Sequence, residues 1–172
     1  AEAVNQYLVQ YLWNAGARVY PVRERDMNAF EAIADNDGSS PQASYSETGT
    51  WATVAFTDTG YGGKSYRWAA TVTGPATAAA TWMATLVEGG NYAVYVWYRA
   101  GANRAPDARY TVYHAGGETT LTVNQQRHGD TWHYLGTFGF LAGEQARVVL
   151  DNRSAFADTV VVAGGGDDRC TV

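Results

Sequence analysis

The sequence predicts a mainly β protein, an antiparallel β-sandwich of the jelly-roll kind with a short helix–strand appendage at its N-terminus. Three observations predict this fold. The 172 residues include 19 Gly, 6 Trp, 12 Tyr and 5 Phe, a composition typical of strands joined by tight turns. From about Ser44 onward, apolar and polar residues alternate with a period of two. Segments rich in Gly, Asn and Asp separate these alternating runs.

The first forty residues follow a different pattern. Apolar residues recur there at three- and four-residue spacing, as on one face of an amphipathic helix: Val4, Tyr7, Leu8, Tyr11 and Leu12. Gly16 suits the end of that helix, and Ala17–Arg23 then predicts a strand, at a sheet edge because it contains Pro21. Residues 27–40 predict a short helical turn followed by a loop. We therefore expect residues 1–40 to form the appendage and residues 41–172 the sandwich.

The period-two region predicts nine strands: Thr50–Phe56, Tyr66–Val72, Ala79–Leu86, Tyr92–Arg99, Ala108–His114, Thr119–Val123, Trp132–Phe138, Ala146–Leu150 and Thr159–Ala163. Nine short strands with turn signals and no helix between them are typical of an antiparallel sandwich. The fourth of these strands is apolar on both faces, which predicts a central position in its sheet.

Charge and composition exclude several classes of partner. The net charge is -5, and the eleven Arg and one Lys are scattered along the chain. A nucleic-acid surface normally shows a basic stripe, so we expect no nucleic-acid partner. No apolar run approaches the ~20 residues of a membrane-spanning helix, so we expect no membrane insertion. The single cysteine, Cys170, excludes an internal disulfide.

Catalytic and metal-binding patterns are also missing from the sequence. The three histidines (His114, His128 and His133) lack the paired spacing of a zinc site, and no serine stands in a G-x-S-x-G motif. We therefore predict no catalytic residue, no metal ligand and no cofactor. One alternative stays open, because "DNDG" (residues 35–38) is a fragment of a calcium-loop pattern that could hold a structural calcium ion.

Several sequence motifs resemble a known family. The stretches "ETGTW", "GGKSYRWA", "NRAPDARYTVYHAGG" and "TVNQQRHGDTWHYLGTFGF" together resemble the golvesin C-terminal / xanthan lyase carbohydrate-binding-like domain, over about residues 44–163. That resemblance implies a β-sandwich accessory module with affinity for polysaccharide. Residues 1–40, whose helix–strand unit ends in "RERD" (residues 23–26), resemble part of an N-acetylmuramoyl-L-alanine amidase. The zinc-binding His and Glu of such amidases have no counterpart here, so we do not expect amidase activity.

Aromatic residues and the resemblance together predict the function. Sugar rings stack on exposed aromatic faces, and planar polar side chains fix their hydroxyl groups. We expect a non-catalytic bacterial module, extracellular or at the cell surface, that binds cell-wall or extracellular polysaccharide or peptidoglycan. The residues predicted to bind the glycan are Tyr61, Trp68, Trp82, Tyr98, Asn103, Arg104, Trp132 and His133.

The N-terminal segment supports an alternative function. A lone helix and an edge strand cannot bury their apolar faces alone, and an edge strand can add to the sheet of another copy. The alternative is therefore a self-assembling extracellular structural protein, a homo-oligomer such as a filament or sheath subunit. Its predicted contact residues are Tyr7, Tyr11, Val19, Tyr20 and Val22.

Overall fold

A computed structural model describes residues 32–37, 41–55, 65–143, 145–164 and 170–171. All of them belong to one compact unit, Glu31–Val172. Every regular element in these ranges is a β-strand, and in them no helix is long and apolar enough to cross a membrane. The predicted helix–strand appendage lies outside the described residues, so the division of the chain into two domains stays a prediction.

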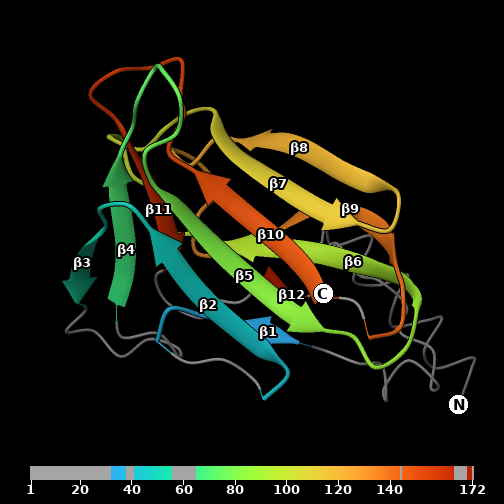
Figure 1. The fold of residues 1–172 in the computed structure, drawn as a ribbon. Coiled ribbons are helices and arrows are strands. Elements are labelled where there is room, and N and C mark those ends of the chain that lie inside the picture. The colour runs from blue at the N-terminus through green and yellow to red at the C-terminus, as the bar shows by residue number, and fades with distance from the viewer. Residues whose placement is uncertain (1–31, 38–40, 56–64, 144, 165–169, 172) are drawn as a thin grey trace, which may run out of the picture. The chain divides into compact units, whose positions relative to one another are not determined.

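The larger sheet has five antiparallel strands. Its strands lie side by side in Figure 1, in an order that differs from their order along the chain. That order is β2 (Ala43–Thr48), β5 (Ala79–Thr85), β10 (Gln145–Asp151), β7 (Ala108–His114) and β8 (Gly117–Val123). Strands distant in sequence therefore become neighbours, as expected for a sandwich rather than a simple meander.

Two smaller antiparallel sheets make up the rest of the sandwich. One has the order β1 (Ile33–Ala34), β12 (Cys170–Thr171), β6 (Gly90–Trp97) and β9 (Trp132–Phe140). The other has the order β11 (Val160–Gly164), β4 (Ser65–Ala70) and β3 (Ala52–Ala55). A single bridge between Tyr98 and Gly164 connects the end of β6 with β11. The two smaller sheets thus continue into one another.

The predicted antiparallel β-sandwich is confirmed, and each of the nine predicted strands overlaps an observed one. The bounds of β7 agree at both ends, and β6 lies between β12 and β9, as its two apolar faces predicted. Three strands were missed. Both β1 and β12 have only two residues, and β2 has the sequence ASYSET, whose small polar side chains give little hydrophobic alternation. The helical turn and loop expected over residues 27–40 is corrected at Ile33–Ala34, which form β1, while residues 27–31 and 38–40 lie outside the described ranges.

The core is built from alternate residues of facing strands. Trp82 of β5 packs against Tyr110 of β7, with ring centroids 6.3 Å apart, and against Tyr45 of β2 at 5.5 Å. In β6 of the other layer, Val94 and Val96 are also buried. Strand β5 alternates regularly between buried and more open residues, the pattern of a sheet packed on one side.

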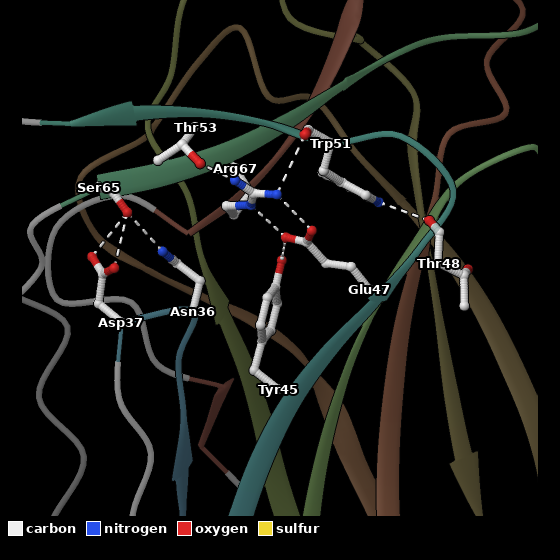
Figure 2. Close-up of polar contacts among 9 residues, drawn as sticks. All are labelled: Asn36, Asp37, Tyr45, Glu47, Thr48, Trp51, Thr53, Ser65 and Arg67. Carbon is white, nitrogen blue, oxygen red and sulfur yellow. Dashed lines mark hydrogen bonds and ion pairs between the residues drawn. The ribbon is translucent and has the colours of Figure 1, made fainter.

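An ion pair joins the two layers at one end of the sandwich (Figure 2). Arg67 of β4 donates from Nε and Nη2 to the two carboxylate oxygens of Glu47 of β2, at 2.6 and 2.8 Å. The Tyr45 hydroxyl donates to the same carboxylate at 2.8 Å, and Arg67 also donates to Thr53 of β3. Two-pronged pairing of arginine with a carboxylate is both strong and directional. It therefore fixes the position of β4 relative to β2.

The environment of this ion pair shifts the pKa values of its members. Burial disfavours the charged form of Glu47, but the hydrogen bonds from Arg67 and Tyr45 and the charge of Arg67 outweigh it and lower its pKa. The hydrogen bond to Glu47 is the main reason why the pKa of Arg67 is raised. Burial, together with the hydrogen bond to Glu47, raises the pKa of Tyr45, so its hydroxyl keeps its proton. The pair is consequently ionised at neutral pH.

We expect Glu47→Gln to lower the free energy of unfolding by about 2 kcal/mol at pH 7, the typical loss for hydrogen bonds to a charged group. Because the pKa of Glu47 is lowered by folding, its contribution is complete above the ordinary glutamate pKa and is lost as the pH falls through the lowered value. Urea unfolding at pH 7 and pH 3 should show the gap between wild type and variant closing in acid. Glu118→Gln, the same change at an exposed residue, controls for the loss of one negative charge. A difference in unfolding free energy between wild type and Glu47→Gln that stays constant with pH would contradict this role of the ion pair.

Candidate functional site

Strands β6 and β9 carry an aromatic surface on the side of their sheet that faces away from the core. Tyr95 lies opposite Tyr134, and Trp97 lies opposite Trp132. Directly opposed residues in an antiparallel pair point to the same side of the sheet. We call these four residues, Tyr95, Trp97, Trp132 and Tyr134, the aromatic face.

Two members of the aromatic face are well exposed. Trp132 keeps 37% and Tyr134 53% of its surface accessible, whereas Val94 and Val96 on the opposite side of β6 are buried. The ring centroids of Tyr95 and Tyr134 are 5.3 Å apart at an interplanar angle of 50°, so this pair forms one contiguous aromatic patch. Large aromatic side chains are normally buried, and a group of them at the surface marks an interaction site.

A β-bulge in β9 shapes the aromatic face. Val94 pairs with Gly136 and Tyr95 pairs with Tyr134, so Leu135 is an extra residue in β9. Glycine is required at 136, because a Cβ there would lie 2.8 Å from the ring of Phe138. Beyond the bulge, Thr137 returns to the outer side, where its hydroxyl is 2.7 Å from that of Tyr134. The bulge thus places a hydrogen-bonding group beside the aromatic rings.

Tyr98 and His133 support the aromatic face from beneath. Tyr98 is fully buried and stacks on the His133 ring, with centroids 4.8 Å apart. Its hydroxyl oxygen lies 2.8 Å from His133 Nε2 and 2.8 Å from the carbonyl oxygen of Arg127, to which it donates. Burial raises the pKa of Tyr98 to about 12, so the hydroxyl remains protonated at neutral pH. These contacts fix the loop that leads into Trp132.

That loop, residues 124–131, has an unusual backbone. His128 and Asp130 both have positive φ, at 53° and 58°, a region that non-glycine residues seldom adopt. The amide of Asp130 donates to the carbonyl oxygen of Tyr98 at 3.0 Å, which ties the turn to the end of β6. Trp132 follows two residues later and begins β9. Its position is therefore set by a tightly anchored turn.

A second group of predicted residues gathers on the outer side of β4. Arg104 donates from Nη2 to the Tyr66 hydroxyl at 3.1 Å and from Nη1 to the Asn103 side-chain oxygen at 2.6 Å. Trp68 lies two residues from Tyr66 along β4, so the two share a face, and Trp68 is half-buried. Trp68, Asn103 and Arg104 therefore cluster around a residue, Tyr66, that was not among the predicted ligands.

The eight predicted glycan residues thus fall into four groups. Trp132 belongs to the aromatic face and His133 lies beneath it, whereas Trp68, Asn103 and Arg104 lie around Tyr66. The prediction that Trp82 and Tyr98 bind the glycan is corrected. Their side chains are 6% and 0% exposed, so the core covers the ring faces that a sugar would need. Tyr61 lies outside the described residues, as do the assembly residues Tyr7, Tyr11, Val19, Tyr20 and Val22. Self-assembly stays a prediction.

Sequence reasoning missed three members of the aromatic face: Tyr95, Trp97 and Tyr134. The alternation of β6 does place Tyr95 and Trp97 on one side, opposite Val94 and Val96. It does not say which side faces the core, because both are apolar. The exposed side became identifiable only when β9 was paired with β6.

Three aspartates in the described part of the chain have hydrogen-bond or ion-pair partners within the protein. Asp151 pairs with Arg153 at 2.6 Å, and Asp107 accepts from the Ala155 amide at 2.8 Å. Asp37, in the "DNDG" segment, accepts a hydrogen bond from the Ser65 hydroxyl at 2.9 Å. Within the described ranges, no group of three or more His, Cys, Asp or Glu residues could hold a metal ion. Gly38 lies outside those ranges, and calcium binding there stays a prediction.

Two xanthan lyases are similar to this chain. The xanthan lyase of Bacillus sp. (strain GL1) is 35% identical over 132 residues, which are 77% of this chain and 14% of the lyase. The structure of a Paenibacillus xanthan lyase matches 82% of this chain and 12% of the lyase, with a TM-score of 0.66 and 31% sequence identity. The chain therefore corresponds to a small part of each enzyme.

A more distant match and a family match complete the comparisons. A Paenibacillus sp. cycloisomaltooligosaccharide glucanotransferase, solved with cycloisomaltoheptaose, matches 98% of this chain and 22% of the enzyme at a TM-score of 0.52. At 15% identity it supports the fold alone. The amidase-like assignment of residues 1–40 stays a prediction. The Golvesin C-terminal domain matches residues 32–165, most of the sequence, and the chain belongs to that family.

Proposed function

We propose that this chain is a non-catalytic module that binds polysaccharide on the aromatic face. The observation that carries the proposal is the pairing of four aromatic residues across β6 and β9, with Trp132 37% and Tyr134 53% exposed. The C–H bonds of a pyranose ring pack on such faces. The hydroxyls of Tyr134 and Thr137 beside them can form hydrogen bonds with the hydroxyl groups of the sugar. Similarity to two xanthan lyases gives independent support for a polysaccharide ligand.

The proposal assigns no catalytic role to the chain. Glu47 is fully engaged with Arg67 and Tyr45, and Asp151 with Arg153. A general acid or base needs a carboxyl group that can exchange a proton with the substrate. The bacterial relatives and a polymeric glycan ligand favour an extracellular or cell-surface place of action, which is part of the same proposal.

The test is binding to immobilised xanthan and to insoluble peptidoglycan. We expect Trp132→Ala and Tyr134→Ala each to raise Kd about tenfold, because loss of a stacking ring removes both buried area and ring-specific attraction. Phe156→Ala is the matched control, since Phe156 is 51% exposed but lies in the loop between β10 and β11.

Two results would contradict the proposal. One is unchanged affinity in both Trp132→Ala and Tyr134→Ala at retained thermal stability, because the aromatic face would then not carry binding. The other is a fall in the chain length of the polymer during incubation with purified protein, which would show catalysis.

A further inference from the structure

Arg104 is a charged side chain inside the protein, with 9% of its surface accessible. Its place is set by the backbone. The Arg104 amide donates to the carbonyl oxygen of Gly101 at 3.0 Å, and the next amide, of Ala105, donates to the carbonyl oxygen of Val160 at 2.8 Å. The backbone at Arg104 is thus held beside β11 by hydrogen bonds that do not involve the charged side chain.

The guanidinium of Arg104 has fewer hydrogen-bond partners than it has N–H donors. Nη1 donates to Asn103 and Nη2 to the Tyr66 hydroxyl, and Cζ lies 5.2 Å from the centre of the Tyr66 ring. Nε is buried and has no hydrogen-bond partner. The ion pairs among the described residues involve Arg67, Arg109 and Arg153, and none of them includes Arg104.

A buried guanidinium normally requires a negative partner. Taking the charge out of water costs free energy that neutral acceptors and one aromatic ring recover only in part. Arg67 in the same fold shows the usual solution, a two-pronged pair with Glu47. Arg104 has five N–H donors, and the described contacts use two of them. The missing element is an anion with oxygen acceptors.

We infer that Arg104 and Asn103 bind the carboxylate of an acidic sugar. This inference rests on the proposed function and names the class of polysaccharide as acidic. A carboxylate matches the planar donor set of arginine. Asn103 is exposed and turns its oxygen toward Arg104, which leaves its amide nitrogen as a further donor beside the guanidinium.

The surroundings of Arg104 suit a sugar that carries this carboxylate. A Cβ at Gly101 would lie 3.4 Å from Arg104 Cζ and 3.5 Å from Nε, so glycine keeps a side chain from covering the guanidinium. Trp68 shares the outer face of β4 with Tyr66 and offers an aromatic surface nearby. The Gln126 side chain donates to the Arg104 carbonyl oxygen at 3.0 Å. Gln126 belongs to the loop that leads into Trp132, so this loop joins Arg104 to the start of β9.

The test compares xanthan with the same polymer after its carboxyl groups have been reduced to alcohols. We expect wild-type protein to bind the acidic polymer about tenfold more tightly, the usual effect of a hydrogen bond to a charged group. Arg104→Met should abolish this preference, and Arg104→Lys should lose most of it, because lysine lacks the planar fork. Arg147→Met is the control, since it removes one exposed arginine from the outer side of β10 and should keep the preference.

The outcomes separate this inference from the proposed function. Equal affinity of wild type for the two polymers, or a preference that survives in Arg104→Met, overturns the inference while polysaccharide binding stands. If Arg104→Met does not fold, Asn103→Ala, at an exposed position, carries the test and should reduce the preference about threefold.

If wild-type protein binds neither polymer, the proposed function fails for xanthan. The inference is then decided by following the ¹⁵N-labelled Arg104 Nε–H signal during titration with methyl glucuronide. A saturable shift that sodium chloride does not reproduce supports the carboxylate site, and a constant signal overturns it.

Discussion

Replacing Gln125 by leucine is expected to lower the free energy of unfolding by about 4 kcal/mol. Gln125 is fully buried, and its side-chain amide forms hydrogen bonds with the backbone of the edge strand β11, as a neighbouring strand would. Its Nε2 donates to the Val162 carbonyl oxygen at 2.7 Å, and its Oε1 accepts from the Val162 amide at 2.8 Å. Leucine fills similar space but leaves both backbone groups of the buried Val162 without these partners, and Tyr110 loses a 2.8 Å hydrogen bond.

Urea unfolding followed by tryptophan fluorescence measures the effect of Gln125→Leu. The matched control is Gln42→Leu, the same change at an exposed residue, which should alter stability by no more than about 0.5 kcal/mol. A loss below about 1 kcal/mol in Gln125→Leu would show that the edge of β11 finds other hydrogen-bond partners.

Asn152→Asp is expected to cost about 4 kcal/mol at pH 7, because it introduces an unpaired buried charge. Asn152 is 2% exposed, and its side chain makes four hydrogen bonds. Its Oδ1 accepts from the amides of Thr77 and Ala78 at 2.9 and 3.0 Å, and its Nδ2 donates to the Ala70 carbonyl oxygen at 2.8 Å and to Thr77 Oγ1 at 3.0 Å. A carboxylate oxygen in place of Nδ2 would face the Ala70 carbonyl oxygen.

The Asn152→Asp variant has a distinctive pH dependence. Burial and the facing carbonyl raise the pKa of the new aspartate above its unfolded value, so the folded state takes up a proton first. Its deficit relative to wild type should therefore shrink as the pH falls through that raised pKa, since the protonated acid can donate to Ala70. Asn91→Asp, at an exposed residue, should show a pH-independent difference near zero. A deficit at Asn152→Asp that does not change with pH would contradict the assigned hydrogen bonds.

The sequence predicted the strands of the sandwich well because alternation and turn residues are local features of the chain. Alternating side chains and turn residues located nine strands, with both ends of β7 correct. The sequence did not predict β1 and β12, because two residues carry no period; β1 pairs with β12, and β12 pairs with β6. Sheet order and the cross-layer pair of Arg67 and Glu47 depend on contacts distant in sequence, which periodicity cannot report.

The site was predicted in part for a related reason. A tryptophan or tyrosine in a strand serves the core and a surface equally well, and the sequence does not say which side is covered. Trp82 is buried between Tyr45 and Tyr110, while Trp132 at 37% exposure reaches the surface. Arg104 stood out in a polar loop motif, but its incomplete hydrogen bonding became visible only with Tyr66 placed beside it.

Because of the extra residue Leu135, the aromatic residues of β9 face two different sides of the sheet. Trp132, Tyr134, Phe138 and Phe140 all occupy even positions, and in a regular strand they would share one side. With the bulge, the first two face outward, while Phe138 contacts His114 of the opposite layer and Phe140 is 3% exposed. Losing the bulge while keeping Leu135 in a regular strand would bring all four rings onto one side, exposing the core pair or burying the surface pair. Natural variation in β9 should therefore keep the bulge and the extra residue together, or lose both together.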